Sequence, residues 1–346
     1  MCAKKVTIRE VAKRAGVSIA TVSQILNGKA MNFNPLTVQK VQAARDELGY
    51  KADHLARQMV GKQSKTIGIL VPEITNSFFS TLVKGIEEEL LRSGYISMLC
   101  NGGFNGAKEE KALLELAKRG VDGFIIASPS ISDEVLKEVL QIKKRPVIVL
   151  DQKTFSERSD EVTTDDFNGG LLAARYLKKM GHTKVAVIVP DLATVNIMYR
   201  LQGFLTEFPQ ALQIKTELSK SGGQAVVAEL LEQNIEAVFA LSDELAFGIY
   251  LGMRQKNKSI PNDLSVIGYD DVEMCRYVTP ALTTVAQPIY ELGKQAADLM
   301  IKRLASPNSP YVKRVLPVKL VIRQLKLKFE AFSKVCYSLV AAIKTF

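Results

Sequence analysis

The sequence has few of the residues on which catalysis and metal binding depend. It holds two histidines and four cysteines, and Cys2, Cys100, Cys275 and Cys336 are scattered without metal-ligand or CxxC spacing. Two histidines without a ligand cluster argue against a metal site, and no Ser-His-Asp or Cys-His set is available for one cleft. We therefore predict a protein that is not an enzyme, needs no metal or cofactor, and keeps unpaired thiols in a reduced compartment.

Long apolar segments are missing too. The opening residues, MCAKKVTIRE, contain no apolar stretch of signal-peptide length. No run approaches the roughly 18 apolar residues that a membrane-spanning helix needs. We therefore expect a cytoplasmic protein with no membrane partner. Its 346 residues, of which 47% are hydrophobic, suffice for two or three packed domains.

Positive charge, in contrast, is concentrated at the start of the chain. Residues 1–63 carry 11 Lys and Arg against 4 Asp and Glu, whereas residues 64–325 carry 31 of each sign. A small basic domain on a neutral body is the distribution expected when that domain meets the phosphates of a nucleic acid. The alternative is a merely solvated basic surface, which the charge alone does not exclude.

Helix signals divide this basic domain into three short helices. Thr7-Ile8-Arg9-Glu10 is a capping box, Gly16 breaks the first helix, and Ser18 can cap the second. Asn34-Pro35 supplies a cap and a proline at the first position of the third helix. Two helices joined by a glycine turn and supported by a third predict a helix-turn-helix domain.

The outward face of the second helix, in AGVSIATVSQILNGK, has the chemistry of a DNA contact. In a helix-turn-helix domain the second helix enters the major groove with its first turn leading. Ser18 and Thr21 suit phosphate oxygens. Ile19 and Ala20 suit thymine methyls, and Gln24 can pair with adenine. The alternative is an ordinary surface helix with two exposed apolar residues. The residues that we assign to double-stranded DNA here are Thr7, Ser18, Ile19, Ala20, Thr21, Ser23, Gln24 and Asn27.

From Lys65 onward, short apolar runs alternate with amphipathic helical windows. This alternation predicts a doubly wound α/β body with buried parallel strands. Its length suits two similar lobes, with a break near 155–162. The runs that we predict to be strands are 67–71, 96–99, 123–127, 147–150, 185–189, 238–241 and 265–269.

Polar and aromatic side chains gather at the carboxyl ends of these strands, where open α/β sheets bind their ligands. Carboxylates, amides and one arginine beside two aromatic rings suit a neutral polyol. For each residue singly the alternative is strand-end capping or a salt bridge between lobes, and for Asp243 we expect helix capping. The candidate effector-binding residues are Asn76, Phe78, Phe79, Asp151, Arg200, Ser242, Asp270 and Gln287.

Four specific motifs carry a family resemblance. They are T-I-x-x-V-A-x-x-A-G-V-S-x-x-T-V-S in the head, LGY at 48–50, VIGYDD at 266–271 and PALTTVAQP at 280–288. From about residue 6 to 324 the chain resembles the lactose-repressor/galactose-repressor family of bacterial transcription regulators. The resemblance implies a homodimer that binds a palindromic operator. It implies a cytoplasmic bacterial protein that associates with the nucleoid. It also implies a small sugar bound between two lobes that are similar to periplasmic sugar-binding proteins.

The resemblance also gives the linker a function. In the family this segment folds into a hinge helix in the minor groove, where a leucine wedges between base pairs. Met59 stands at the matching place, and we add His54, Arg57 and Met59 to the DNA-binding residues. Gln24 departs from the more usual arginine, which leaves the preferred operator bases open.

The same resemblance makes ribose the first guess for the sugar. TNSFF at 75–79 is similar to a ribose-type Asn-x-Phe-Phe signature, and Arg200, Asp270 and Gln287 match sugar-contacting positions. Gln152, however, stands where ribose-binding proteins carry arginine, and Ser242 stands where asparagine is common.

The predicted fold is an N-terminal all-α helix-turn-helix DNA-binding domain followed by an α/β periplasmic-binding-protein-like body of two doubly wound lobes. The heptad spacing of apolar residues in the tail leaves two alternatives, a coiled coil that joins dimers into a tetramer or a mere extension. The expected ranges are 1–60 with a hinge helix at 53–60, 64–159 with 288–312 for one lobe, 160–287 with 313–325 for the other, and 326–346 for the tail.

We therefore predict a transcriptional repressor of a sugar-utilisation operon that a small sugar releases from DNA. One alternative is a global carbon-catabolite regulator of the same family, controlled by a phosphorylated partner such as a phosphocarrier protein. The other alternative is a cytoplasmic sugar-binding protein without a DNA function, against which the basic helix-turn-helix head argues.

Overall fold

The computed structural model describes residues 6–50, 64–141, 145–150 and 159–324. The chain divides into two compact units between Ser64 and Lys65. The predicted hinge helix at 53–60 and the tail at 326–346 lie outside the described residues. No helix in the described ranges is both long enough and apolar enough to cross a membrane.

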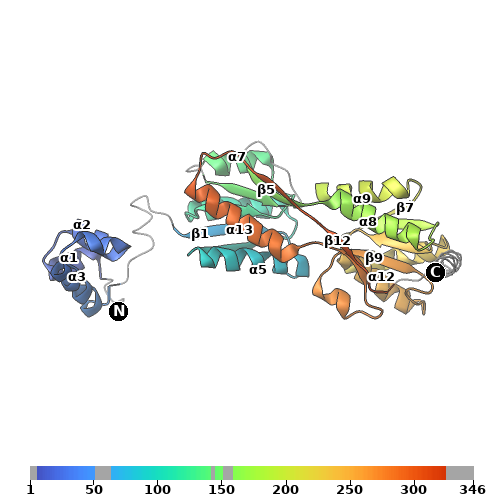
Figure 1. The fold of residues 1–346 in the computed structure, drawn as a ribbon, viewed down its shortest axis with the longest axis horizontal. Coiled ribbons are helices and arrows are strands. Elements are labelled where there is room, and N and C mark those ends of the chain that lie inside the picture. The colour runs from blue at the N-terminus through green and yellow to red at the C-terminus, as the bar shows by residue number, and fades with distance from the viewer. Residues whose placement is uncertain (1–5, 51–63, 142–144, 151–158, 325–346) are drawn as a thin grey trace, which may run out of the picture. The chain divides into compact units, whose positions relative to one another are not determined.

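The first unit is a small helical domain (Figure 1). Its helices and turns are α1 (Ile8–Ala15), α2 (Ile19–Gln24), the π-helical turn η1 (Ile25–Lys29), the 3-10 turn η2 (Ala30–Asn32) and α3 (Pro35–Glu47). The predicted helix-turn-helix arrangement with a third helix is confirmed. Its core consists of Val11, Ala12, Ala15, Val22, Ile25, Val41 and Ala44.

Local capping explains why the helices start and end at these residues. The Thr7 amide donates a 2.7 Å hydrogen bond to Glu10 Oε2, and Gly16 ends α1 with φ +68°, a conformation that glycine adopts without steric cost. Ser18 Oγ accepts a hydrogen bond from the Thr21 amide, and Asn34 Oδ1 accepts one from the Leu36 amide. These are the caps that the sequence predicts.

The second unit contains two six-stranded sheets, each covered by helices on both faces (Figure 1). The first sheet has the order β11-β5-β4-β3-β1-β2 and is parallel throughout. Helices α5 and α13 pack on one face, and α6 and α7 pack on the other. The elements of this lobe are β1 (Thr66–Val71), α5 (Ser77–Arg92), β2 (Ile96–Asn101), α6 (Gly106–Lys118), β3 (Gly123–Ile126), α7 (Asp133–Gln141), β4 (Val147–Leu150), β5 (Asp160–Thr164), α13 (Ile289–Ala305) and β11 (Lys313–Leu316).

The second sheet has the order β12-β10-β9-β8-β6-β7, and β12 is its antiparallel member. Helices α8 and α9 pack on one face, and α10, α11 and α12 pack on the other. The elements of this lobe are α8 (Asp166–Lys179), β6 (Val185–Pro190), α9 (Val195–Glu207), β7 (Leu212–Thr216), α10 (Lys220–Ala225), α11 (Val227–Glu232), β8 (Ala237–Ala240), α12 (Asp243–Gln255), β9 (Ser265–Asp270), the 3-10 turn η4 (Glu273–Arg276), β10 (Thr283–Ala286) and β12 (Lys319–Val321).

The predicted lobe boundaries are wrong at two strands. We expected residues 160 and 313 to open segments of the second lobe, but β5 and β11 pair with each other in the first sheet. The chain therefore crosses between lobes after Thr164 and again after Leu316, in addition to the crossing between β10 and α13. Buried Arg303 explains part of this pairing, because its Nε donates a 2.8 Å hydrogen bond to Asp160 at the start of β5.

Candidate functional site

The outward face of α2 is uncharged, and part of it is apolar. Ile19 is 45% exposed although it is a large hydrophobic residue, and Ala20 and Gln24 are also exposed. Val22, on the opposite face, is buried in the domain core. The structure therefore brings together on one surface the apolar and amide groups that the sequence assigns to base edges.

Hydroxyl groups flank this surface at the helix starts. Ser18 Oγ lies 2.9 Å from Thr21 Oγ1, and the Thr7 hydroxyl donates a 3.0 Å hydrogen bond to Glu10. Ser23 is half-buried. The side chain of Asn27 lies outside the described set, as do His54, Arg57 and Met59.

In the second unit, Arg200 of α9 is the centre of a buried polar cluster. Its side chain is 4% exposed. Its Nε donates a 2.7 Å hydrogen bond to Asp166 Oδ1, and its Nη1 donates a 2.8 Å bond to the Leu241 carbonyl. The guanidinium also lies 3.8 Å from the centre of the Tyr269 ring, within cation–π distance. Burial alone would lower the pKa of Arg200, but Asp166, Tyr269 and Asp270 outweigh it and raise that pKa above its ordinary value.

Asp270 and Gln287 complete the cluster. Asp270 Oδ1 lies 3.6 Å from Arg200 Nη1 and accepts a 2.6 Å hydrogen bond from Gln287 Nε2. Burial raises the pKa of Asp270 well above its ordinary value, with a further contribution from Asp243 and against the opposing effect of Arg200. Asp270 also has φ +127°, a strained conformation of the kind that persists at ligand sites. The structure thus brings Arg200, Asp270 and Gln287 together at the carboxyl edge of the second sheet.

Ser242 and Asp243 hold the start of α12. Ser242 Oγ accepts a hydrogen bond from the Leu245 amide, so Ser242 caps a helix, which was the alternative to sugar binding. It directly follows Leu241, whose carbonyl accepts from Arg200. Asp243 is fully buried and accepts hydrogen bonds from Thr284 Oγ1 at 2.7 Å and from the Val272 amide at 3.0 Å. Burial raises the pKa of Asp243 to about 6. These contacts agree with the structural role expected for Asp243.

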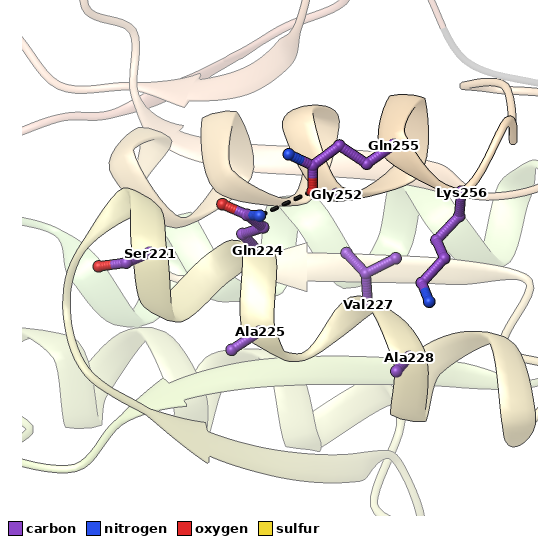
Figure 2. A pocket seen from close by; sticks show the side chains of 8 residues that line it. All are labelled: Ser221, Gln224, Ala225, Val227, Ala228, Gly252, Gln255 and Lys256. Carbon is purple, nitrogen blue, oxygen red and sulfur yellow. Dashed lines mark hydrogen bonds between the residues drawn. The ribbon is translucent and has the colours of Figure 1, made fainter.

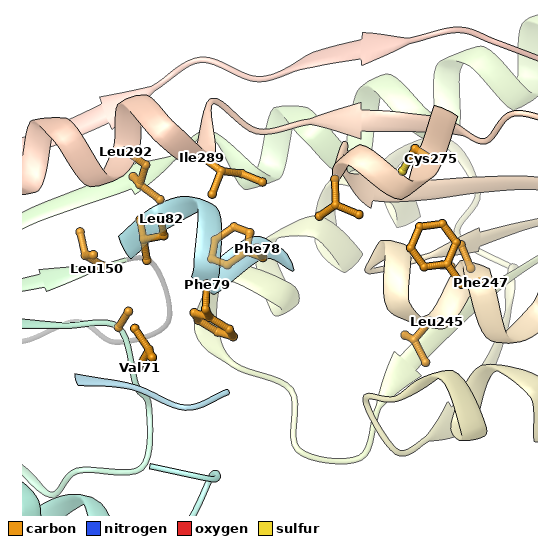
Figure 3. Close-up of a cluster of buried hydrophobic side chains, with 14 of the residues drawn as sticks. Val71, Phe78, Phe79, Leu82, Leu150, Leu245, Phe247, Cys275, Ile289 and Leu292 are labelled. Atoms are coloured by element: carbon orange, nitrogen blue, oxygen red, sulfur yellow. The ribbon is translucent and has the colours of Figure 1, made fainter. Parts of the chain in front are cut away.

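The remaining candidates belong to the first lobe. Asn76 caps α5, since its Oδ1 accepts a 2.9 Å hydrogen bond from the Phe78 amide. Phe78 and Phe79 meet edge to face with ring centres 5.1 Å apart, and Figure 3 shows Phe78 beside Ile289 within a buried apolar cluster. Asp151 lies outside the described residues. No hydrogen bond of the described residues joins this group to the Arg200 cluster.

Three members of the cluster were not among the predicted site residues, namely Asp166, Tyr269 and Thr164. Asp166 accepts hydrogen bonds from the Tyr269 hydroxyl at 2.9 Å and from Thr164 Oγ1 at 3.1 Å, in addition to the one from Arg200. The signal in the sequence was the pair Asp165-Asp166. Only the first of the two is needed as a helix cap, because Asp165 Oδ1 accepts from the Asn168 amide.

A separate groove of about 400 Å³ lies between α10, α11 and α12 (Figure 2). Across it, Gln224 Nε2 donates a 2.7 Å hydrogen bond to Gln255. This groove is on the face of the second sheet opposite to α8 and α9, which carry Asp166 and Arg200. It is therefore distinct from the candidate ligand site.

Comparisons with known proteins cover both units. The profile of the bacterial regulatory proteins of the lacI family matches residues 7–53, and that of the periplasmic binding protein-like domain matches residues 174–324. The ribose operon repressor of Escherichia coli K12 is 33% identical over 87% of this chain and 94% of its own length. The HTH-type transcriptional repressor PurR of Vibrio parahaemolyticus is 34% identical over 92% of this chain and 97% of its own.

Solved structures agree with these matches. A LacI family transcriptional regulator from Enterococcus faecium with bound ribose is 44% identical with a TM-score of 0.73, and the match covers 76% of this chain and 99% of that one. The lac repressor dimer bound to operator and an anti-inducer is 26% identical with a TM-score of 0.81, and the match covers 94% of this chain and all of that one.

Proposed function

Because the chain belongs to the lacI family of bacterial regulatory proteins, we propose that it represses transcription of a sugar-utilisation operon and leaves its operator when a small sugar binds. Ribose is the sugar that we propose first. The repressor acts on double-stranded DNA in the bacterial cytoplasm, requires no cofactor and is not an enzyme.

The buried cluster of Arg200, Asp270 and Gln287 is the observation that carries this proposal. A guanidinium, a carboxylate and an amide at the carboxyl edge of a sheet supply the donors and acceptors that sugar hydroxyls need. The ribose bound by the 44% identical Enterococcus regulator supports the choice of sugar. The PurR relative has a similar identity to this chain as the ribose operon repressor has, so ribose is tested directly as the effector.

In the head, the proposed operator contacts are those of α2. Ile19 and Gln24 reach base edges in the major groove, and the hydroxyls at the helix starts reach phosphates. The predicted hinge helix at 53–60, with Met59 as its wedge, adds minor-groove contacts. The effector weakens operator binding by changing the relation of the two lobes and thereby disorganising this hinge.

We propose a homodimer whose interface includes the free edge of the first sheet. Strand β2 ends that sheet, and Leu91, Ile96, Met98 and Leu99 on or beside it are exposed. An apolar edge strand left open is a site of association between chains. In sedimentation experiments Ile96→Lys should shift the protein toward monomer. The matched change Leu192→Lys, at a residue that is 90% exposed elsewhere, should leave the dimer intact.

Fluorescence anisotropy on a palindromic DNA with a central CG step, with and without millimolar D-ribose, tests the proposal. Ribose should release the DNA from the wild-type protein and from Asp191→Asn, an exposed control, but much less from Asp270→Asn. Gln24→Ala should weaken DNA binding, whereas Gln42→Ala, the same change at an exposed position of α3, should not.

The possible outcomes separate the alternatives. Tight DNA binding that ribose leaves unchanged would retain the repressor and direct the search for its effector to another sugar or to a phosphorylated protein. Ribose binding without any DNA binding would contradict the repressor and favour a sugar-binding protein.

A further inference from the structure

The Arg200 cluster has a charge balance that limits what can bind there. One guanidinium faces two buried carboxylates, Asp166 at 2.7 Å and Asp270 at 3.6 Å. Asp243 is also fully buried and interacts electrostatically with Asp270. A buried cation that is already paired attracts a further anion only weakly at close range, because the nearby carboxylates repel that anion.

The unused hydrogen-bonding atoms point to the same conclusion. Among the described residues, no hydrogen bond uses Arg200 Nη2 or Asp270 Oδ2, whereas both oxygens of Asp166 are occupied. A guanidinium nitrogen and a carboxylate oxygen that are both unused match a hydroxyl group, which accepts from the first and donates to the second. A phosphate group has no proton to give Asp270 when it is fully ionised, and it would leave that carboxylate facing another anion.

We infer that the effector is an uncharged sugar, and that Asp166 excludes phosphorylated sugars by holding and neutralising Arg200. This inference rests on the proposed function, because it concerns the ligand of the same site. Asp166 acts through Arg200 and through the Tyr269 ring beneath it, so it is a positioning residue for specificity.

Titration calorimetry on the full chain tests the inference with D-ribose, ribose 1-phosphate and ribose 5-phosphate, which carry their phosphates at opposite ends of the sugar. The wild-type protein should bind ribose at least about 100-fold more tightly than either phosphate, because like charges at short range cost several kcal/mol. Asp166→Asn keeps the shape and an accepting oxygen for Arg200 while it removes one negative charge. Asp166→Asn should reduce the ratio of the phosphate Kd to the ribose Kd about tenfold or more, since a charged partner of Arg200 becomes neutral.

The neighbouring change Asp165→Asn is the matched control. Asparagine caps helices as well as aspartate does, and Asp165 contacts the Asn168 amide and not Arg200, so the wild-type ratio should be retained. An unchanged ratio in Asp166→Asn, or a phosphate that binds as tightly as ribose to the wild type, overturns the inference. A phosphate ester that releases the operator would overturn it while leaving the sugar-responsive repressor in place. Failure of all three ligands to bind would remove ribose from the proposed function as well.

Discussion

Two ion pairs join the same two helices, α8 and α9, and differ in burial. Arg200–Asp166 has side chains 4% and 3% exposed, and Arg175–Glu207 has side chains 61% and 21% exposed. Truncation of Arg200 leaves Asp166 as an uncompensated buried charge, which costs about 3–5 kcal/mol. Truncation of Arg175 removes an exposed pair that contributes about 0–1 kcal/mol, and Lys178 stays 2.9 Å from Glu207.

Urea unfolding at pH 7, followed by circular dichroism, measures both changes in one assay. We expect Arg200→Ala to lower the free energy of unfolding of the second unit several times more than Arg175→Ala does. Adding Asp166→Asn to Arg200→Ala should recover part of the loss, because it removes the stranded charge. Equal losses for the two arginines, or a double variant less stable than Arg200→Ala, would refute this account of the cluster.

Three further predictions concern other parts of the chain. Burial raises the pKa of Asp243 from 3.8 to about 6, so its neutral form is favoured by folding. Its stabilising contribution, up to about 3 kcal/mol, is complete below about pH 4 and is lost as pH rises through 6. Urea midpoints should show this fall, and Asp243→Asn should flatten it. A methyl group on Gly170 would collide with the backbone oxygen of Arg200, so Gly170→Ala should cost about 1–3 kcal/mol in thermal unfolding and weaken ribose binding. Asn34→Ala removes the hydrogen bond to the Leu36 amide and should cost the head about 1 kcal/mol, whereas Asn34→Asp should not.

Local signals were sufficient for the head because its helix boundaries depend on neighbouring residues. The Thr7 capping box, the turn at Gly16 and the caps at Ser18 and Asn34 each involve contacts of at most four residues along the chain. Six of the seven apolar runs of the body are buried strands for a similar reason, since a strand covered on both faces must be apolar throughout. The seventh, at 96–99, was wrongly predicted to be buried, because β2 is an exposed edge strand.

The lobe boundaries and the centre of the site depended on distant contacts instead. Strand β5 reads DEVTT and β11 reads KRVL, so neither contains an apolar run that assigns it to a sheet. Their placement depends on pairing across about 150 positions of sequence. Asp166 was missed for a related reason. Its partners Arg200 and Tyr269 are 34 and 103 residues away, and beside a capping aspartate it has the pattern of an ordinary helix start.

Gln287 gives the proposed ligand site a hydrogen-bonded link to the first lobe. Its Nε2 donates to Asp270 at the end of β9, in the second sheet. Its Oε1 lies 2.9 Å from the Thr164 hydroxyl at the end of β5, in the first sheet, and shares the proton of that hydroxyl with Asp166 Oδ2. A ligand hydroxyl that donates to Asp270 Oδ2 shares this carboxylate with the amide of Gln287, and any reorientation of the amide changes the bond to Thr164. Two buried hydrogen bonds contribute about 1–3 kcal/mol together, which is the size of a typical coupling energy between sites. Rearrangement of the Gln287 side chain is therefore large enough in free energy to couple ligand binding to the segments where the chain crosses between the lobes.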